Sequence, residues 1–188
     1  YSLILPGRYE VAYRSLGDED NNKKEALRAV FADYLNELTE NMPAPAPLTE
    51  EFRKEMANLS EFATRARSPV DRDMRSREKE ITYVNTPEQP PRFAKQLKVI
   101  AQALMIINEK PELEPVDRDI IYKLAFDSIS ATRRIVLKEL AKYKEVDTAS
   151  LATKINYPTN TVRHMLEDLN ALKICDRSKT GKADKWAI

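Results

Sequence analysis

The stretch that decides the fold is YPTNTVRHMLEDLNALKI, residues 157–174, in which a proline-containing turn precedes an amphipathic segment. With Val162 at zero on a helical wheel of about 100° per residue, the apolar side chains gather on one side. They are Val162, Met165, Leu166, Leu169 and Leu172. The opposite side carries Asn160, Arg163, His164 and Glu167. The pattern predicts a helix that buries one face and leaves a polar, partly basic face open to a partner.

The segments before this helix are consistent with a small helical module. Ser130 is a suitable N-cap for a helix over residues 131–143. Residues 145–148, EVDT, are predicted to be extended. A short helix is expected over residues 148–156, with Thr148 as its cap. A four-residue turn then leads into the amphipathic helix.

The end of the chain is predicted to form a β-hairpin. Residues 174–177 and 185–188 are β-capable arms on either side of a polar, basic tip that contains Gly181. The order helix, short strand, short helix, turn, helix and hairpin is that of a winged helix-turn-helix. Residues 130–188 resemble the winged domains of bacterial transcription regulators such as the ArsR and MarR families.

This resemblance implies a set of DNA contacts on the polar face. Thr159 and Thr161 can donate to the DNA backbone at the helix N-terminus, where N–H groups favour phosphate. Asn160 and Arg163 are residue types that bind adenine and guanine edges through two hydrogen bonds. Further candidates are His164, for phosphate or base, and the hairpin residues Lys179, Lys182 and Lys185, for neighbouring phosphates. Glu167 is unfavourable near phosphate, and a solvated face or a protein-docking module is the alternative interpretation.

Composition excludes several kinds of site. The only glycines are Gly7, Gly17 and Gly181, so neither a phosphate-binding loop nor a dinucleotide fingerprint can be written. A single cysteine, Cys175, excludes an internal disulfide. A single histidine, His164, disfavours a conventional zinc site. No metal and no cofactor is therefore expected in this chain itself.

Charge is divided unevenly along the 188 residues. Residues 130–188 contain twelve Lys and Arg against seven Asp and Glu, a net charge of +5. Residues 1–129 contain nineteen against twenty-three, a net charge of −4. A basic C-terminal third favours a polyanionic partner, although ordinary surface scatter is the alternative. No apolar run reaches the roughly 20 residues that a membrane span requires, and a cytoplasmic setting is expected.

Apolar spacing predicts helices upstream, too. They are expected over residues 26–38, 49–63, 92–107 and 116–126. Between Arg65 and Glu80 six basic residues alternate with acidic ones, too many charges to bury, and residues 81–84 are predicted to be a short strand. The missing initiator Met before Tyr1 favours a segment of a longer protein.

Two of these upstream stretches carry a second resemblance. LSEFATRARSPVDRDMRSREKEITYV, followed by PPRFAKQLKVIAQALMII, resembles the end of an AAA+ ATPase module and its helical lid, as in MCM-type helicases and related bacterial ATPases. The resemblance implies that Arg92 is the sensor 2 arginine, which touches the γ-phosphate of ATP. It also implies that Arg65, Arg67 or Arg72 acts across a subunit boundary. A simple surface or salt-bridge role for Arg92 is the alternative.

The sequence therefore predicts a mainly α protein. Residues 1–129 would be a helical, AAA+-lid-like region, and residues 130–188 a winged helix-turn-helix with a small hairpin wing. The favoured function is DNA binding within a larger, self-associating helicase-like ATPase that uses ATP and Mg²⁺ elsewhere. The alternatives are a bacterial transcription regulator with a helical dimerisation or sensing region, and a winged-helix protein-interaction module.

Overall fold

A computed structural model describes residues 19–40, 44–180 and 183–188 of the chain. The chain has two compact units, Tyr1–Ala44 and Pro45–Ile188. Over the described ranges it is mainly helical, with seven helices and two small antiparallel sheets, which confirms the predicted helical class. None of the helices in these ranges is long and apolar enough to cross a membrane.

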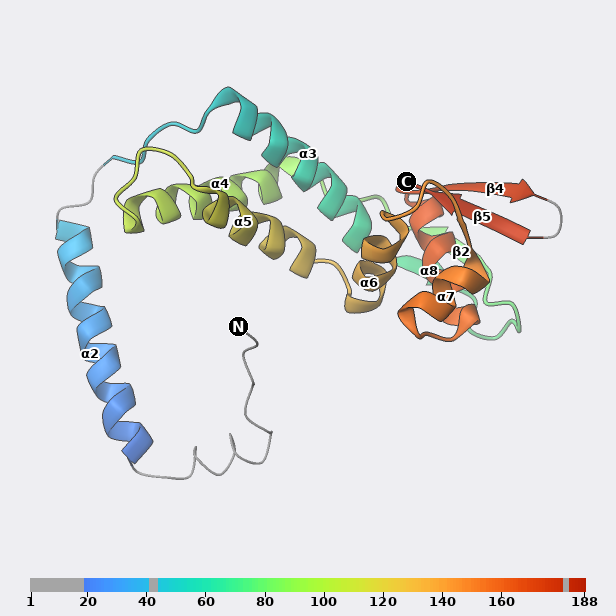
Figure 1. The fold of residues 1–188 in the computed structure, drawn as a ribbon, viewed down its shortest axis with the longest axis horizontal. Coiled ribbons are helices and arrows are strands. Elements are labelled where there is room, and N and C mark those ends of the chain that lie inside the picture. The colour runs from blue at the N-terminus through green and yellow to red at the C-terminus, as the bar shows by residue number, and fades with distance from the viewer. Residues whose placement is uncertain (1–18, 41–43, 181–182) are drawn as a thin grey trace. The chain divides into compact units, whose positions relative to one another are not determined.

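The first unit contains one described helix, α2 (Glu19–Glu40), where the sequence predicted an amphipathic helix (Figure 1). Its apolar stripe is not buried. Leu27, Val30 and Phe31 are all more than 60% exposed to solvent. The helix is therefore an amphipathic element whose apolar face is open.

The second unit begins with three helices that pack on one another. They are α3 (Glu50–Arg67), α4 (Pro90–Ile107) and α5 (Pro115–Asp127), which lie side by side in Figure 1. Phe52, Leu97 and Ile121 are among the buried residues of their shared core. The predicted starts of two helices are confirmed. Thr49 caps α3 by accepting a hydrogen bond from the Phe52 N–H, and two prolines form the first turn of α4.

A short hairpin connects α3 to α4. Strand β1 (Val70–Arg72) pairs antiparallel with β2 (Ile81–Val84), and residues 73–80 form the β1–β2 loop between them. The second strand was predicted. The first was not, because it lies in the stretch that was expected to be too charged to bury.

The remaining elements form a compact C-terminal module. Its helices are α6 (Ala131–Leu140), α7 (Thr148–Ile155) and α8 (Thr159–Ala171). Its strands are β3 (Val146–Asp147), β4 (Asp176–Thr180) and β5 (Ala183–Ala187), in the antiparallel order β3–β5–β4. This is the predicted order of elements along the chain.

The core of this module centres on Trp186, which is fully buried. The apolar face of α8 packs there through Val162, Leu166 and Leu169. The indole Nε1 donates a 2.8 Å hydrogen bond to the hydroxyl of Thr148. Thr148 was predicted to cap α7, and this was wrong, because Asp147 caps that helix through the Ser150 N–H while Thr148 serves the tryptophan.

The core also extends into the helical layer. Ala66 of α3 and Ile129 belong to the same buried cluster as Trp186, and Phe62 and Phe126 pack against that cluster. The two phenylalanine rings lie 5.7 Å apart, centroid to centroid. The predicted domain boundary between residues 129 and 130 therefore falls inside one compact unit.

Candidate nucleic-acid interface

The first turn of α8 is open to solvent. Thr159 and Asn160 are exposed, and Thr161 is half-buried. The N-cap residue, Pro158, provides no side-chain hydrogen bond to the first backbone N–H groups of the helix. The turn before it is made by Asn156, whose φ of 55° is left-handed, a conformation that asparagine tolerates better than most residues. The local sequence therefore exposes Thr159 and Asn160, and Thr161 in part.

The second half of the polar face is covered by the β1–β2 hairpin. Arg72, at the end of β1, donates to Asp168 Oδ1 from Nε at 3.0 Å and from Nη2 at 2.7 Å. Its Nη2 also donates to the His164 carbonyl at 2.8 Å, and its Nη1 reaches Glu167 at 3.1 Å. One guanidinium therefore binds three residues of α8, through a backbone carbonyl and two carboxylates.

Asp168 receives a second arginine from the opposite side. Arg133 on α6 donates to Asp168 Oδ2 at 3.1 Å and to the carbonyls of Ala66 and Ser68 at 3.1 and 2.5 Å. Asp168 and Arg133 are buried, and the Arg72 side chain is 10% exposed. The carboxylate uses both oxygens, and the arginines have further acceptors, as a buried ion network requires. This network joins the end of α3, β1, α6 and α8.

Arg163 and His164 lie beside this network and are half-buried. Arg163 is shared by two carboxylates, Glu78 of the β1–β2 loop at 3.6 Å and Glu167 at 3.8 Å. The pKa of His164 is lowered, first by burial and then by the positive charge of Arg72. Its ring is consequently neutral near pH 7, and its Nε2 has no hydrogen-bond partner among the described residues.

A groove of about 410 Å³ runs along this covered half of α8. Glu80 and Ile81 line it from the hairpin, Asn170 from α8 and Arg177 from β4. Because Glu78 and Glu167 also line it, its charges are mixed. Both the β1–β2 hairpin and the C-terminal hairpin therefore border this part of α8.

The predicted lysines of the C-terminal hairpin differ from one another. Lys179 is exposed and faces Asp184 across the strand pair. Lys185 is half-buried and bound to Glu145 at 2.9 Å, which also lowers the pKa of that carboxyl. Lys182 lies outside the described residues. Of the two predicted hairpin lysines that the structure describes, Lys179 is thus more available to a phosphate than Lys185.

The structure also separates the four arginines singled out upstream. The Arg92 side chain is 80% exposed at the first turn of α4, with Glu88 at 3.9 Å. Arg67 forms an ion pair with Glu88, and its guanidinium stacks over the Phe93 ring. Arg65 forms an ion pair with Glu61. Arg72 is bound to α8. Of the four arginines, Arg92 therefore has the side chain most exposed to solvent.

Sequence reasoning missed the residues that organise this surface: Arg72 as a binding partner of α8, Arg133, Asp168 and Glu78. One signal existed, because Asp168 sits at the edge of the apolar stripe, next to Leu169, where a carboxylate needs a partner. Among the described residues, no group of three or more His, Cys, Asp or Glu is arranged to hold a metal ion.

Comparisons with known proteins leave the family open: no protein-family model, no curated protein and no solved structure matches the chain.

Proposed function

We propose that residues 130–188 form a winged helix-turn-helix that binds duplex DNA through the first turn of α8 and the C-terminal hairpin. The observation that carries the proposal is the open first turn, with Thr159 and Asn160 exposed on a helix whose other face is buried. A helix held rigidly on its apolar side, with free N–H groups at its start, is suited to a groove lined by phosphates.

The order of elements and the sheet support the same proposal. The strands β4 and β5 follow α8 as a hairpin and complete a three-stranded antiparallel sheet with the earlier strand β3, as in a winged helix. In this arrangement Asn160 reads a base edge, and Lys179 contacts a phosphate of the flanking backbone.

Arg163 would contribute less to DNA affinity than an arginine without ion-pair partners. It must leave Glu78 and Glu167 before it can bind a guanine or a phosphate. Leaving Glu78, whose side chain is 64% exposed, costs little, about 1 kcal/mol or less. Glu167 is 23% exposed and also bound by Arg72, so that carboxylate keeps a positive partner when Arg163 leaves. Arg163 therefore adds less affinity than an unpaired arginine at the same position.

For the larger protein we retain the proposal of a helicase-like ATPase of the AAA+ type. Its support in this chain is Arg92, an exposed arginine in the first turn of a helix, where a guanidinium suits a γ-phosphate. ATP and Mg²⁺ would be bound largely by residues outside this sequence, which has no phosphate-binding loop.

One observation favours the alternative of a transcription regulator. The open apolar face of α2, with Leu27, Val30 and Phe31, is what a dimerisation helix would present. Sedimentation of the chain distinguishes the two proposals, because a regulator predicts a dimer that is lost in Leu27→Asp. An ATPase segment predicts no dependence of its mass on that substitution.

DNA binding is tested by titrating the chain against a labelled duplex of about 20 base pairs, roughly two helical turns. We expect the affinity to fall steeply with salt, and Asn160→Ala to weaken binding by about 1–3 kcal/mol at a preferred sequence. Lys179→Ala should weaken binding to all sequences alike. Lys123→Ala on α5, which also removes an exposed positive charge, is the control. The absence of salt-dependent binding by the unaltered chain would refute the proposal.

A further inference from the structure

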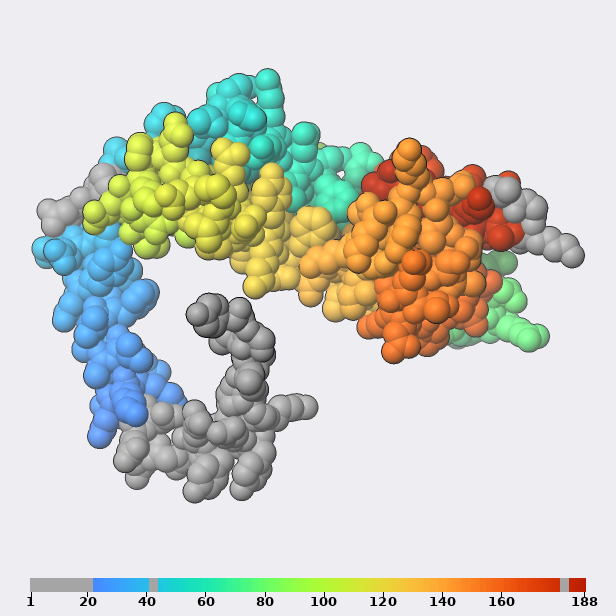
Figure 2. Space-filling view, viewed as in Figure 1, coloured from blue at the N-terminus to red at the C-terminus, as the bar shows by residue number. Residues whose placement is uncertain are grey.

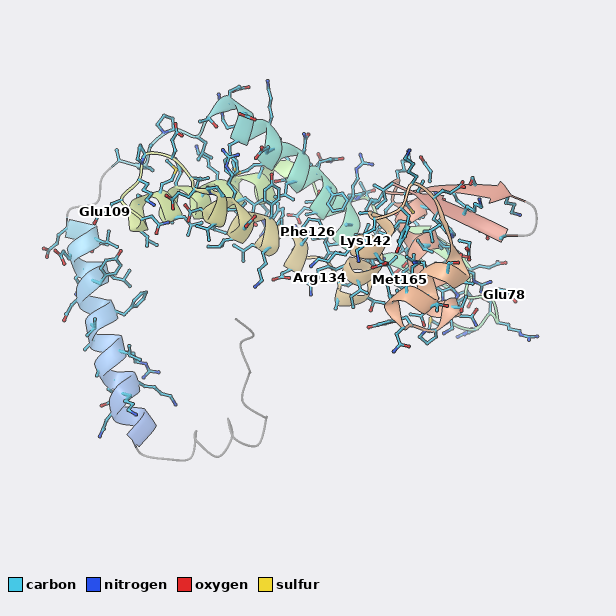
Figure 3. All side chains as sticks on the ribbon, in the orientation of Figure 1. Glu78, Glu109, Phe126, Arg134, Lys142 and Met165 are labelled. Carbon is cyan, nitrogen blue, oxygen red and sulfur yellow. The ribbon has the colours of Figure 1, made fainter. Side chains whose placement is uncertain are left out.

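The β1–β2 loop stands beside α8 on the side that the proposed DNA surface uses. Its end is fixed there, since Glu78 pairs with Arg163 and the Lys79 carbonyl accepts a 2.7 Å hydrogen bond from Arg72. In Figure 3 the loop carrying Glu78 extends outward past the α7 and α8 helices. Figure 2 shows its green atoms protruding beyond the orange surface of the C-terminal module.

The loop is ordered by its own hydrogen bonds. Asp73 accepts from the Arg75 N–H through its carboxylate at 2.8 Å and from the Ser76 hydroxyl through its carbonyl at 3.2 Å. The backbone of Asp73 donates to the Glu80 carbonyl, which closes the loop at its base. Lys79 takes a left-handed φ of 49°, which is unusual for a lysine. These bonds hold the backbone of the loop in one conformation, from which its exposed side chains extend.

Three basic side chains on this loop are exposed: Arg75, Arg77 and Lys79. Within the described part of the chain none of the three forms an ion pair, whereas Arg163 and Lys185 on the predicted DNA surface are both paired. The loop also carries Asp73, Glu78 and Glu80, so its formal net charge is zero. What distinguishes its basic side chains from those on the covered half of α8 is that they are exposed and outside the ion pairs of the described residues. Unpaired cations on an ordered loop are suited to phosphates, since no internal partner has to be released.

We propose that the β1–β2 loop is a second phosphate-binding arm, which contacts the duplex through Arg75 and Arg77 beside α8. This inference rests on the proposed function, because α8 must face DNA for the loop to reach it. The β1–β2 hairpin, α8 and Arg177 of β4 line one groove, so both hairpins border the same helix. The duplex would thus be held by two hairpins in addition to the reading helix.

The same loop also covers Arg163 with Glu78, which is what an inhibitory lid would do. Because the loop covers only part of the polar face of α8, we favour a phosphate-binding arm over a lid. The first turn of α8, with Thr159 and Asn160, is left open, and the only ionic contact between Glu78 and α8 is with Arg163 among the described residues. The loop therefore borders the reading surface without closing it.

The test compares two double variants of the whole chain on the same duplex. Arg75→Ala/Arg77→Ala should lower the slope of log affinity against log salt by about two and weaken binding by roughly tenfold or more near 100 mM salt. Lys95→Ala/Lys98→Ala on α4 removes two exposed charges elsewhere and should leave the slope unchanged. All four side chains are exposed, so neither double variant should change the stability of the fold. Equal unfolding midpoints would verify this.

The outcomes separate this inference from the proposed function. If the unaltered chain binds and Asn160→Ala weakens binding, but the loop variant binds as the unaltered chain does, the arm is refuted and the DNA-binding module stands. Equal weakening by the loop and the α4 variants also refutes the arm, since the effect then follows net charge. If the unaltered chain does not bind DNA, both proposals fail. Tighter binding by the loop variant would show that the loop is a lid.

Discussion

The two hairpins of the second unit are fixed in opposite ways. The β4–β5 hairpin is held by Trp186, whose side chain is fully buried and donates a hydrogen bond from the indole Nε1 to the Thr148 hydroxyl. The β1–β2 hairpin is held by Arg72, whose guanidinium binds Asp168, Glu167 and the backbone of α8. Apolar burial stabilises a strand through a non-directional interaction. A buried ion network requires one geometry, and its stabilisation is lost when any one of its charged residues is removed.

The residue content of the β1–β2 hairpin explains why it needs an ion network. Val70 and Ile81 are only half-buried, and Tyr83 is 58% exposed. Two short strands with so little apolar burial are marginal by themselves. The contrast predicts different responses of the two hairpins to substitution and to pH.

The largest effect is expected from Trp186→Ala. It removes the largest fully buried side chain and leaves Thr148 without its donor, so the free energy of unfolding should fall by about 3–5 kcal/mol. Denaturant unfolding measures this. Trp186→Phe, which keeps most of the apolar area, should cost clearly less. An equal loss in both variants would mean that the hydrogen bond, and not burial, holds the β4–β5 hairpin.

Asp168→Asn should have the next largest effect. It leaves two largely buried arginines without their carboxylate, and such a loss typically costs about 3 kcal/mol. The β1–β2 hairpin should also lose amide protection against hydrogen exchange, while β4–β5 keeps it. Asp127→Asn, which breaks an exposed pair with Arg134, is the matched control and should cost less than about 1 kcal/mol. Uniform loss of protection would show that the network does not hold the β1–β2 hairpin in particular.

The smallest expected effect concerns His164. Its pKa is lowered by burial and by Arg72, Arg163 and Lys79, and is opposed by Glu167. A histidine with a lowered pKa stabilises the fold above its ordinary value of about 6.5, and this contribution is lost as the pH falls through the lowered value. The stability difference between the unaltered chain and His164→Gln should therefore shrink or reverse from about pH 7 to about pH 5. A difference that is constant with pH would contradict this.

Much of the fold could be predicted because helices report their buried face through local spacing. Phe52 and Leu97 lie on the stripes that predicted α3 and α4, and Val162 and Leu166 on the stripe that predicted α8. The caps were less predictable. Ser130 lies at the N-cap of α6 but makes no capping bond through its side chain. The choice between neighbouring hydroxyl and carboxyl groups depends on tertiary partners, such as Trp186, that local sequence does not specify.

The candidate site was predictable in its exposed part only. Asn160 follows from helical spacing, and the structure leaves it open. The environment of Arg163 does not, because Glu78 lies 85 positions earlier in the chain and the pairing of distant charges leaves no periodic trace. For the same reason Arg72, expected at the surface, is 10% exposed.

The bonds from Arg133 to the carbonyls of Ala66 and Ser68 have a mechanical consequence. They attach α6 to the last turn of α3, and Asp168 carries the attachment on to α8. The three helices are therefore attached to one another through buried side chains as well as through the connecting chain. Substitution of Arg133 would remove the attachment of α6 to both α3 and α8 at once.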